Sequence, residues 1–160
     1  MGIQKGKKLM LFVKDSTGST YNSIGYATNH SFNSSVSTVD TSHKDVADTT
    51  GGNGKWDNQE PDTYSWSITS EHFYADTANG YTPADIMKFY IAGTELDVKF
   101  GITTDSTTGV PDGGWTPSTG SSVPMLSGKV IITSIDIQAP NGDNATMSIT
   151  FTGKGAVTVA

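Results

Sequence analysis

The sequence of 160 residues contains no cysteine, so neither disulfide bonds nor thiolate metal sites hold this fold together. Charged residues make up only 16% of the chain and hydrophobic residues only 34%, and glycine, serine and threonine take their place. This composition is typical of a β-rich protein with many turns. The length favours one domain, which we expect to span residues 1–160.

Long apolar runs and a basic charge balance are also missing. The apolar run at residues 9–13 is too short for the core of a signal peptide, and no segment approaches membrane-spanning length. We therefore expect a soluble protein that is made inside the cell and does not bind membranes. The formal net charge of −6 argues against direct binding of nucleic acid.

The motifs of common enzyme classes are absent as well. His30, His43 and His72 form no HxxxH or HExxH pattern, and no GxSxG elbow occurs. The glycine-rich residues 51–55 are followed by Trp56, where a P-loop needs Ser or Thr. The sequence therefore predicts no catalytic residues, no metal site and no cofactor, and it favours a protein that is not an enzyme.

Alternation of polar and apolar side chains is the strongest pattern present, and it is longest at residues 62–74. Successive side chains of a strand point to opposite faces, so one face should carry Tyr64, Trp66 and Ile68 as core anchors. Similar patterns predict strands at residues 8–14, 21–27, 28–41, 95–104, 128–139 and 145–153, and a short edge strand at the tail, 156–160.

One helix is predicted at residues 83–92. Thr82 is placed to cap its N-terminus, Pro83 stands at the first helical position, and Asp85 can reach back to free amide groups. Gly93 is placed to end the helix. The expected fold class is mainly β: a β-sandwich or partly open barrel of about seven or eight antiparallel strands with one packed α-helix.

Two long segments have no sustained period. Residues 42–61 carry several glycines and Trp56, and they are either an interaction arm or a surface loop. Residues 104–124 form a second irregular loop, with Trp115 as its one large side chain.

Carboxylates occur on the polar faces of several predicted strands. Glu71, Glu95, Asp97 and Asp136 all fall on the polar parity of their segments. They are either ordinary solvent-facing charges or, together with the acidic balance of the chain, the lining of a channel.

Two stretches taken together resemble the major tail tube proteins of long-tailed bacteriophages. Residues 24–45 are followed across a variable loop by YSWSITSEHFY at residues 64–74, which is similar to the family's order of an AxxxxxxL and DxSxKD stretch before a SWSxSxExxY strand. The matching positions are Ala27, Phe32, Asp40, Ser42, Lys44, Asp45, Trp56, Ser65, Trp66, Ser67, Ser70, Glu71 and Tyr74.

The resemblance implies a structural virion protein with a tail tube-like β-sandwich. Six copies would form a ring whose inner strands close into a barrel, and rings would stack into a tube that delivers DNA without binding it specifically. The implied partners are further copies of the chain and neighbouring tail proteins, namely the tape measure, the terminator and the baseplate. The implied location is the virion tail, after assembly in the host cytoplasm.

The resemblance also implies roles for particular residues. The family's lumen is acidic, and the residues assigned to it here are Ser65, Ser67, Thr69, Glu71 and Asp97. The segment between the two matched strands corresponds to the family's inter-ring stacking arm, which would use Lys44, Asp45, Asp48, Lys55, Trp56 and Asp57.

Two other functions are compatible with the sequence. A β-sandwich binding module, for example for carbohydrate, would use Trp56 and Trp115 as stacking platforms on loops. The tube protein of a contractile injection system would share the architecture of a phage tail tube.

Overall fold

The structure is a computed structural model that describes residues 3, 5–15, 18, 20–40, 59–75, 80–104, 114–118 and 124–159. The chain divides into two compact units. The first, called the body, consists of Met1–Asn33 and Ser67–Ala160. The second, called the hairpin unit, is Ser34–Trp66.

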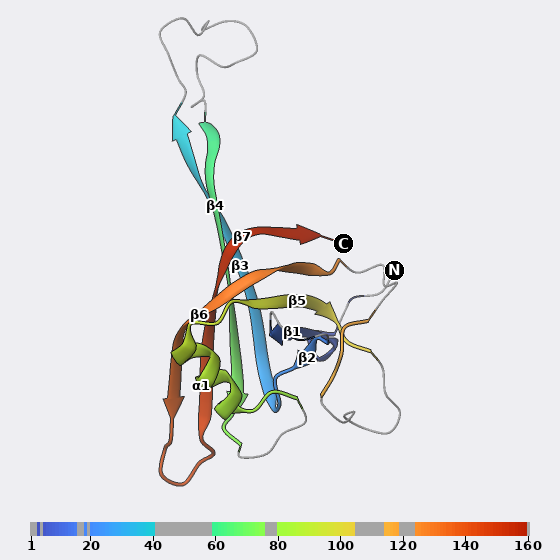
Figure 1. The fold of residues 1–160 in the computed structure, drawn as a ribbon, viewed down its shortest axis with the longest axis vertical. Helices are drawn as coiled ribbons and strands as arrows, with labels where there is room; N and C mark the ends of the chain where they lie inside the picture. Colours follow the sequence, from blue (N-terminus) through green and yellow to red (C-terminus); the bar gives the residue numbers. More distant parts are fainter. Residues whose placement is uncertain are drawn as a thin grey trace, which may run out of the picture. The chain divides into compact units, whose positions relative to one another are not determined.

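The described residues form seven strands, one α-helix and one short 3₁₀-helix (Figure 1). The strands belong to one sheet in the order β2-β1-β5-β6-β7-β4-β3, and the strand pairs with a defined register are antiparallel. This confirms the expected class, mainly β with seven antiparallel strands and one helix. The elements are η1 Gly6–Lys8, β1 Leu9–Asp15, β2 Asn22–Ser23, β3 Ala27–Asp40, β4 Gln59–Phe73, α1 Pro83–Ala92, β5 Leu96–Ile102, β6 Leu126–Gln138 and β7 Thr146–Val159.

Helix α1 has the predicted bounds because its end signals are local. The Thr82 hydroxyl accepts a hydrogen bond from the backbone N–H of Asp85, and the Asp85 carboxylate accepts one from the backbone N–H of Thr82 at 3.1 Å. Gly93 ends the helix at φ 64°, a left-handed conformation that glycine adopts without steric cost. The helix contacts β6, and Ile86 is fully buried.

The register between β4 and β7 separates the sheet into two faces. Ile68 lies opposite Phe151 and Ser70 opposite Ile149, and all four side chains are buried on what we call the core face. The side chains between them point the other way and define the polar face, whose cross-strand pairs here are Ser67 with Thr152, Thr69 with Thr150 and Glu71 with Ser148.

The polar face continues across the sheet to β1. On β7, Lys154 has the same parity as Thr152, and it lies opposite Lys129 of β6. Lys129 in turn lies opposite Asp97 of β5, and Asp97 lies opposite Lys14 of β1. Since directly opposed residues of antiparallel strands share a face, Asp97 lies on the same face as Ser67, Thr69 and Glu71.

Tyr64 is not a core anchor, although Trp66 and Ile68 are buried as predicted. The Tyr64 side chain is 69% exposed. Its position lies in the hairpin unit, and the pairing of β4 with β7 begins only at Ser67. Alternation therefore identified the parity of Tyr64 correctly, but no layer of the described residues covers it.

The predicted separate edge strand at the C-terminal tail is also wrong. Strand β7 runs without a break to Val159, which lies opposite Leu126 of β6. Gly155 adopts φ 82° where the register with β6 shifts, between the pairs Lys129–Lys154 and Ser127–Thr158. Within the described residues no helix is long and apolar enough to cross a membrane.

Candidate functional site

Hydroxyl groups line the middle of the polar face. Thr152 of β7 lies opposite Ser67 of β4. The Thr152 hydroxyl also lies 2.9 Å from the hydroxyl of Thr133 on β6. Thr69 and Thr150 form the next row along the two strands. These groups form hydrogen bonds with water and carry no charge, so the middle of this face has no cationic group that would bind a polyanion.

Two carboxylates lie at one end of the polar face. Ser148 of β7 is paired with Glu71 of β4 on one side and with Asp136 of β6 on the other. All three residues line a hollow of about 210 Å³. Within the described residues neither carboxylate has an ion-pair partner. Glu71 is exposed, so this end of the face is acidic.

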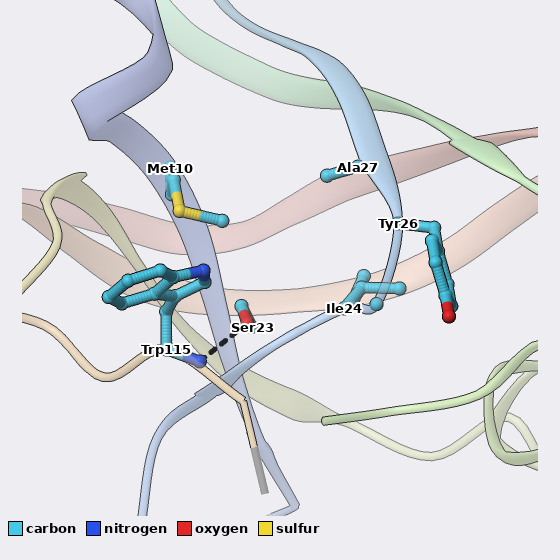
Figure 2. Close-up of a pocket in the computed structure, with 7 residues that line it drawn as sticks. Met10, Ser23, Ile24, Tyr26, Ala27 and Trp115 are labelled. Carbon is cyan, nitrogen blue, oxygen red and sulfur yellow. Dashed lines mark hydrogen bonds between the residues drawn. The ribbon is translucent and has the colours of Figure 1, made fainter. Parts of the chain in front are cut away.

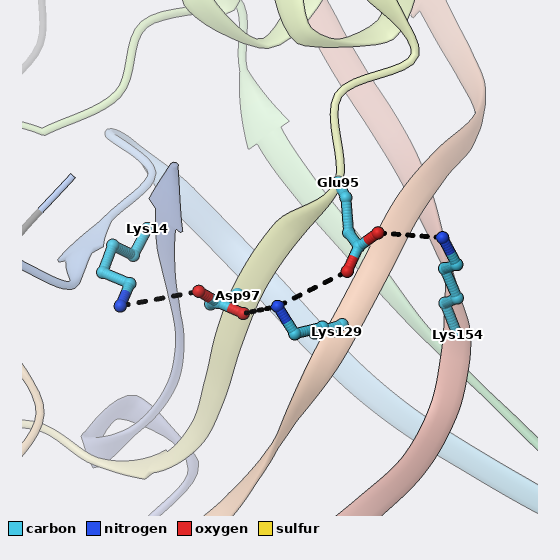
Figure 3. Close-up of polar contacts among 5 residues, drawn as sticks. All are labelled: Lys14, Glu95, Asp97, Lys129 and Lys154. Atoms are coloured by element: carbon cyan, nitrogen blue, oxygen red, sulfur yellow. Dashed lines mark hydrogen bonds and ion pairs between the residues drawn. The ribbon is translucent and has the colours of Figure 1, made fainter. Parts of the chain in front are cut away.

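At the other end, five charged side chains form a continuous array across the sheet (Figure 3). Asp97 lies 3.5 Å from the Lys14 ammonium and 3.4 Å from that of Lys129. Glu95 lies 3.4 Å from Lys129 and accepts a hydrogen bond of 2.9 Å from Lys154. The hydrogen bond from Lys154 lowers the pKa of Glu95, and the hydrogen bond to Asp97 raises the pKa of Lys129.

An open groove of about 460 Å³ lies beside this array. Tyr21, Lys129 and Lys154 line it, and so does Gly155. The Tyr21 ring also carries two cations, because the Lys14 and Lys99 ammonium groups lie 4.9 and 4.5 Å from its centroid. Asp97 also lines this groove and is ion-paired there, whereas Glu71 is an exposed carboxylate at the opposite end of the face.

A pair of histidines, which the sequence patterns did not connect, lies near the core. The Ser70 hydroxyl contacts His30 Nδ1 at 2.8 Å and also His72 Nε2, and the two rings are 5.7 Å apart between centroids. Burial lowers the pKa of His30 to about 4. Burial, and secondly the neighbouring His30, lower the pKa of His72 to about 4. The pair is therefore neutral at pH 7.

Trp115 lines a cavity of about 290 Å³ between β1 and the start of β3 (Figure 2). Its backbone N–H donates to the Ser23 hydroxyl at 2.9 Å, and its carbonyl accepts from the Ser23 backbone N–H at 2.8 Å. Tyr26, at φ 56°, lines the same cavity. These bonds fasten the Trp115 backbone to β2, and its side chain is half-buried.

The structure brings together some of the predicted site residues. Ser67, Thr69, Glu71 and Asp97 share the polar face. Ser65 belongs to the hairpin unit, where its hydroxyl contacts that of Ser35 at 3.0 Å. The predicted stacking residues Lys44, Asp45, Asp48, Lys55, Trp56 and Asp57 lie outside the described residues.

Two stretches of backbone edge are unpaired within the described residues. β3 is the last strand of the sheet, so no described strand lies beyond its outer edge. β5 pairs with β6 only at Leu126–Val130, so residues 131–138 of β6 pair with β7 on one side and with no described strand on the other. These edges bound a four-stranded segment, β6-β7-β4-β3.

The family model described as phage tail tube protein matches residues 3–159 of the chain. No curated protein matches it in sequence.

Several solved structures share the fold. The tail of an empty gene transfer agent particle, refined with C6 symmetry, is 17% identical over 99% of each chain, with a TM-score of 0.71. The SPP1 tail tube is 9% identical, covering 98% of this chain and 78% of that one, with a TM-score of 0.67. The anti-feeding prophage baseplate is 6% identical, covering 100% and 96%, with a TM-score of 0.58.

Proposed function

Because this chain belongs to the phage tail tube protein family, we propose that six copies of it pair edge to edge into a ring and that the rings stack into a DNA conduit. The family is a structural one rather than an enzyme class. The fold is that of chains found in assembled tails, one of which was refined with C6 symmetry. Two strand edges would form the contacts within a ring, and the arm would form the contacts between rings. The polar face would line the channel.

The pair of unpaired edges carries this proposal. In the segment β6-β7-β4-β3, β7 is antiparallel to both β6 and β4. The β3 residues 28, 34 and 37 contact β4 at 71, 65 and 63, so β3 is antiparallel to β4 and runs opposite to β6. If β3 of one copy, along residues 27–33, pairs with residues 131–138 of β6 in the next copy, the antiparallel alternation continues. Repetition of this head-to-tail contact closes a ring and leaves neither of these two edges exposed.

The polar face would line the channel of such a ring. The core face is filled by apolar side chains, so the face with Ser67, Thr69 and Glu71 is the one available to water. Its hydroxyls carry no charge and its exposed carboxylates repel a phosphate backbone, while Lys14, Lys129 and Lys154 at the other end of the face are paired with Glu95 and Asp97. DNA would therefore pass without specific binding.

Residues 42–61 would be the stacking arm between rings, and its contacts would come from the charged and aromatic side chains between Lys44 and Asp57. The remaining tail partners, the tape measure, terminator and baseplate, would meet the ends or the lumen of the tube. Assembly would take place in the host cytoplasm, and the finished protein would be part of the virion tail.

Negative-stain electron microscopy of the purified protein tests the assembly. We expect rings or tubes, with a central channel visible in end views. A protein that stays monomeric under all concentrations and salt conditions contradicts the proposal.

A deletion of residues 48–54 tests the arm separately. The body retains every residue of its core in this variant, so the fold and the rings should persist while tubes shorten or disappear. Tubes of normal length in the deletion variant would show that the arm is not the stacking element.

A further inference from the structure

We propose that Ile135 and Ile137, on the unpaired edge of β6, enter a hollow beside β3 of the next copy and so fix the register in which the two edges pair. This inference rests on the proposed function, since it names the side chains by which one copy would recognise the next. Every residue that it uses belongs to the body.

A hollow of about 280 Å³, called the β3 hollow, lies between the start of β1 and the start of β3. Leu9 and Met10 line it from the β1 side, next to residues of η1, and residues 27–30 line it from the β3 side. No described residue of β4, the neighbour of β3 in the sheet, lines it. The hollow therefore lies along the outer edge of β3.

The unpaired stretch of β6 carries the apolar side chains that would enter. Ile135 lies opposite Ile149 of β7, and Ile137 lies opposite Met147. Ile149 and Met147 are fully buried on the core face, so both β6 isoleucines point to that face as well. Ile137 is nevertheless 43% exposed, and no described strand pairs with this part of β6 on its other side. A second copy paired there would remove it from water.

Side-chain parity restricts the register between the copies, because directly opposed residues of paired strands share a face. On β3, His30 Nδ1 lies 2.8 Å from the hydroxyl of Ser70, which is buried on the core face. His30 and Thr28 therefore have the parity of the core face. Ile135 and Ile137 have to lie opposite even-numbered residues of β3, and a slip by one residue would turn them to the polar face.

The ends of the two strands select one register among those that parity allows. β3 begins at Ala27 and β6 ends at Gln138, and aligning these two residues meets the parity condition. The polar face then agrees as well, since the exposed amide of Asn29 would lie opposite the exposed carboxylate of Asp136. The predicted pairs are Ala27 with Gln138, Thr28 with Ile137, Asn29 with Asp136 and His30 with Ile135.

This register brings the isoleucines to the β3 hollow. Residues 27–30 line the hollow, and the core face of β3 is the side on which β5 packs, since the rings of Phe32 and Phe100 lie 6.2 Å apart between centroids. β1 is paired with β5 along its whole length, so it lies in the same layer. Ile135 and Ile137, on that same face, would therefore meet the apolar side chains of β1 across the hollow.

Cysteine cross-linking tests the register, because the natural chain contains no cysteine. Opposed residues of antiparallel strands have Cα atoms about 4.5–5.5 Å apart, within the range of a disulfide. T28C/I137C, assembled under reducing conditions and then oxidised, should give a ladder of covalently linked copies on a non-reducing gel. N29C/I137C, shifted by one residue to the other face, is the matched control and should give no ladder.

A substitution tests the contribution of the isoleucine itself. I137S should raise the protein concentration needed for assembly at least about tenfold, because the apolar side chain that the contact would bury is lost. I91S, at a side chain of α1 that is 79% exposed, is the control and should assemble like the wild type. Sedimentation over a concentration series gives this concentration, and circular dichroism shows whether each variant is folded.

The outcomes separate this inference from the proposed function. A28-to-137 pairing is overturned by a ladder from N29C/I137C, by assembled T28C/I137C that does not cross-link, or by wild-type assembly of folded I137S. A27C/Q138C, which tests the same register with both isoleucines in place, covers the case in which T28C/I137C does not assemble. If the wild type itself never assembles, the proposed function fails instead.

Discussion

Acid should destabilise this protein mainly through His30 and His72. The His72 side chain is buried and that of His30 is half-buried. Burial lowers the pKa of each to about 4, so both are neutral at pH 7, whereas an unfolded histidine has a pKa near 6.5. Between these two values the unfolded chain binds more protons than the folded one. The free energy of unfolding therefore falls as the pH falls from about 6.5 to about 4, and it is unaffected by these groups above that window.

The size of the effect follows from the two shifts. At pH 5 each histidine should lower the free energy of unfolding by about 2 kcal/mol relative to pH 8, so the pair contributes about 4 kcal/mol. With a urea dependence of about 2 kcal/mol per molar, the unfolding midpoint should fall by about 2 M.

The test compares urea unfolding of the wild type and H30N/H72Q at pH 8, 6.5 and 5, at one protein concentration. The amides of Asn and Gln reach the positions of His30 Nδ1 and His72 Nε2 and do not titrate, so the variant should lose most of the pH dependence. S70A is the control: it keeps both rings buried and should retain the dependence. Equal pH dependence in the wild type and H30N/H72Q would refute the assignment of acid sensitivity to this pair.

Substitutions in and beside α1 test its packing and its C-terminal cap. I86A should lower the free energy of unfolding by about 3 kcal/mol, because Ile86 is fully buried. The control I91A, at a side chain that is 79% exposed, should change it by less than about 0.5 kcal/mol. Similar losses in urea unfolding of both variants would contradict the packing of this helix. G93A should cost about 1 kcal/mol, since alanine is strained at φ 64°, and an unchanged melting profile would show that the left-handed cap is dispensable.

Local signals in the sequence were sufficient for α1 and for the positions of most strands. Thr82, Asp85 and Gly93 act within one turn of the helix ends, so the bounds of α1 could be predicted without knowledge of its neighbours. Alternation likewise identified the parity of Ser67, Thr69 and Glu71, which the structure places on one face. It could not decide whether a second layer covers Tyr64, because that depends on where the pairing with β7 begins.

The charged array and the histidine pair depend on long-range register, which no local pattern contains. Asp97 meets Lys14 and Lys129 only because three strands distant in the sequence are paired in one register. His30 and Ser70 are 40 residues apart in the chain. One signal was available: His72 and Ser70 share the parity of Ile68, which marked both as facing the core.

Accessibility of residue 71 in assembled tubes is the most direct measurement of whether the polar face lines a channel. The chain has no cysteine, so E71C and K88C each introduce a single thiol, and both positions are exposed before assembly. In tubes, E71C should react with a small maleimide but be protected from a polymer-linked maleimide too large to enter the channel, while K88C serves as the reference thiol outside the polar face. Equal reaction of E71C with both reagents in intact tubes, at the rate seen before assembly, would contradict a polar face that lines the channel.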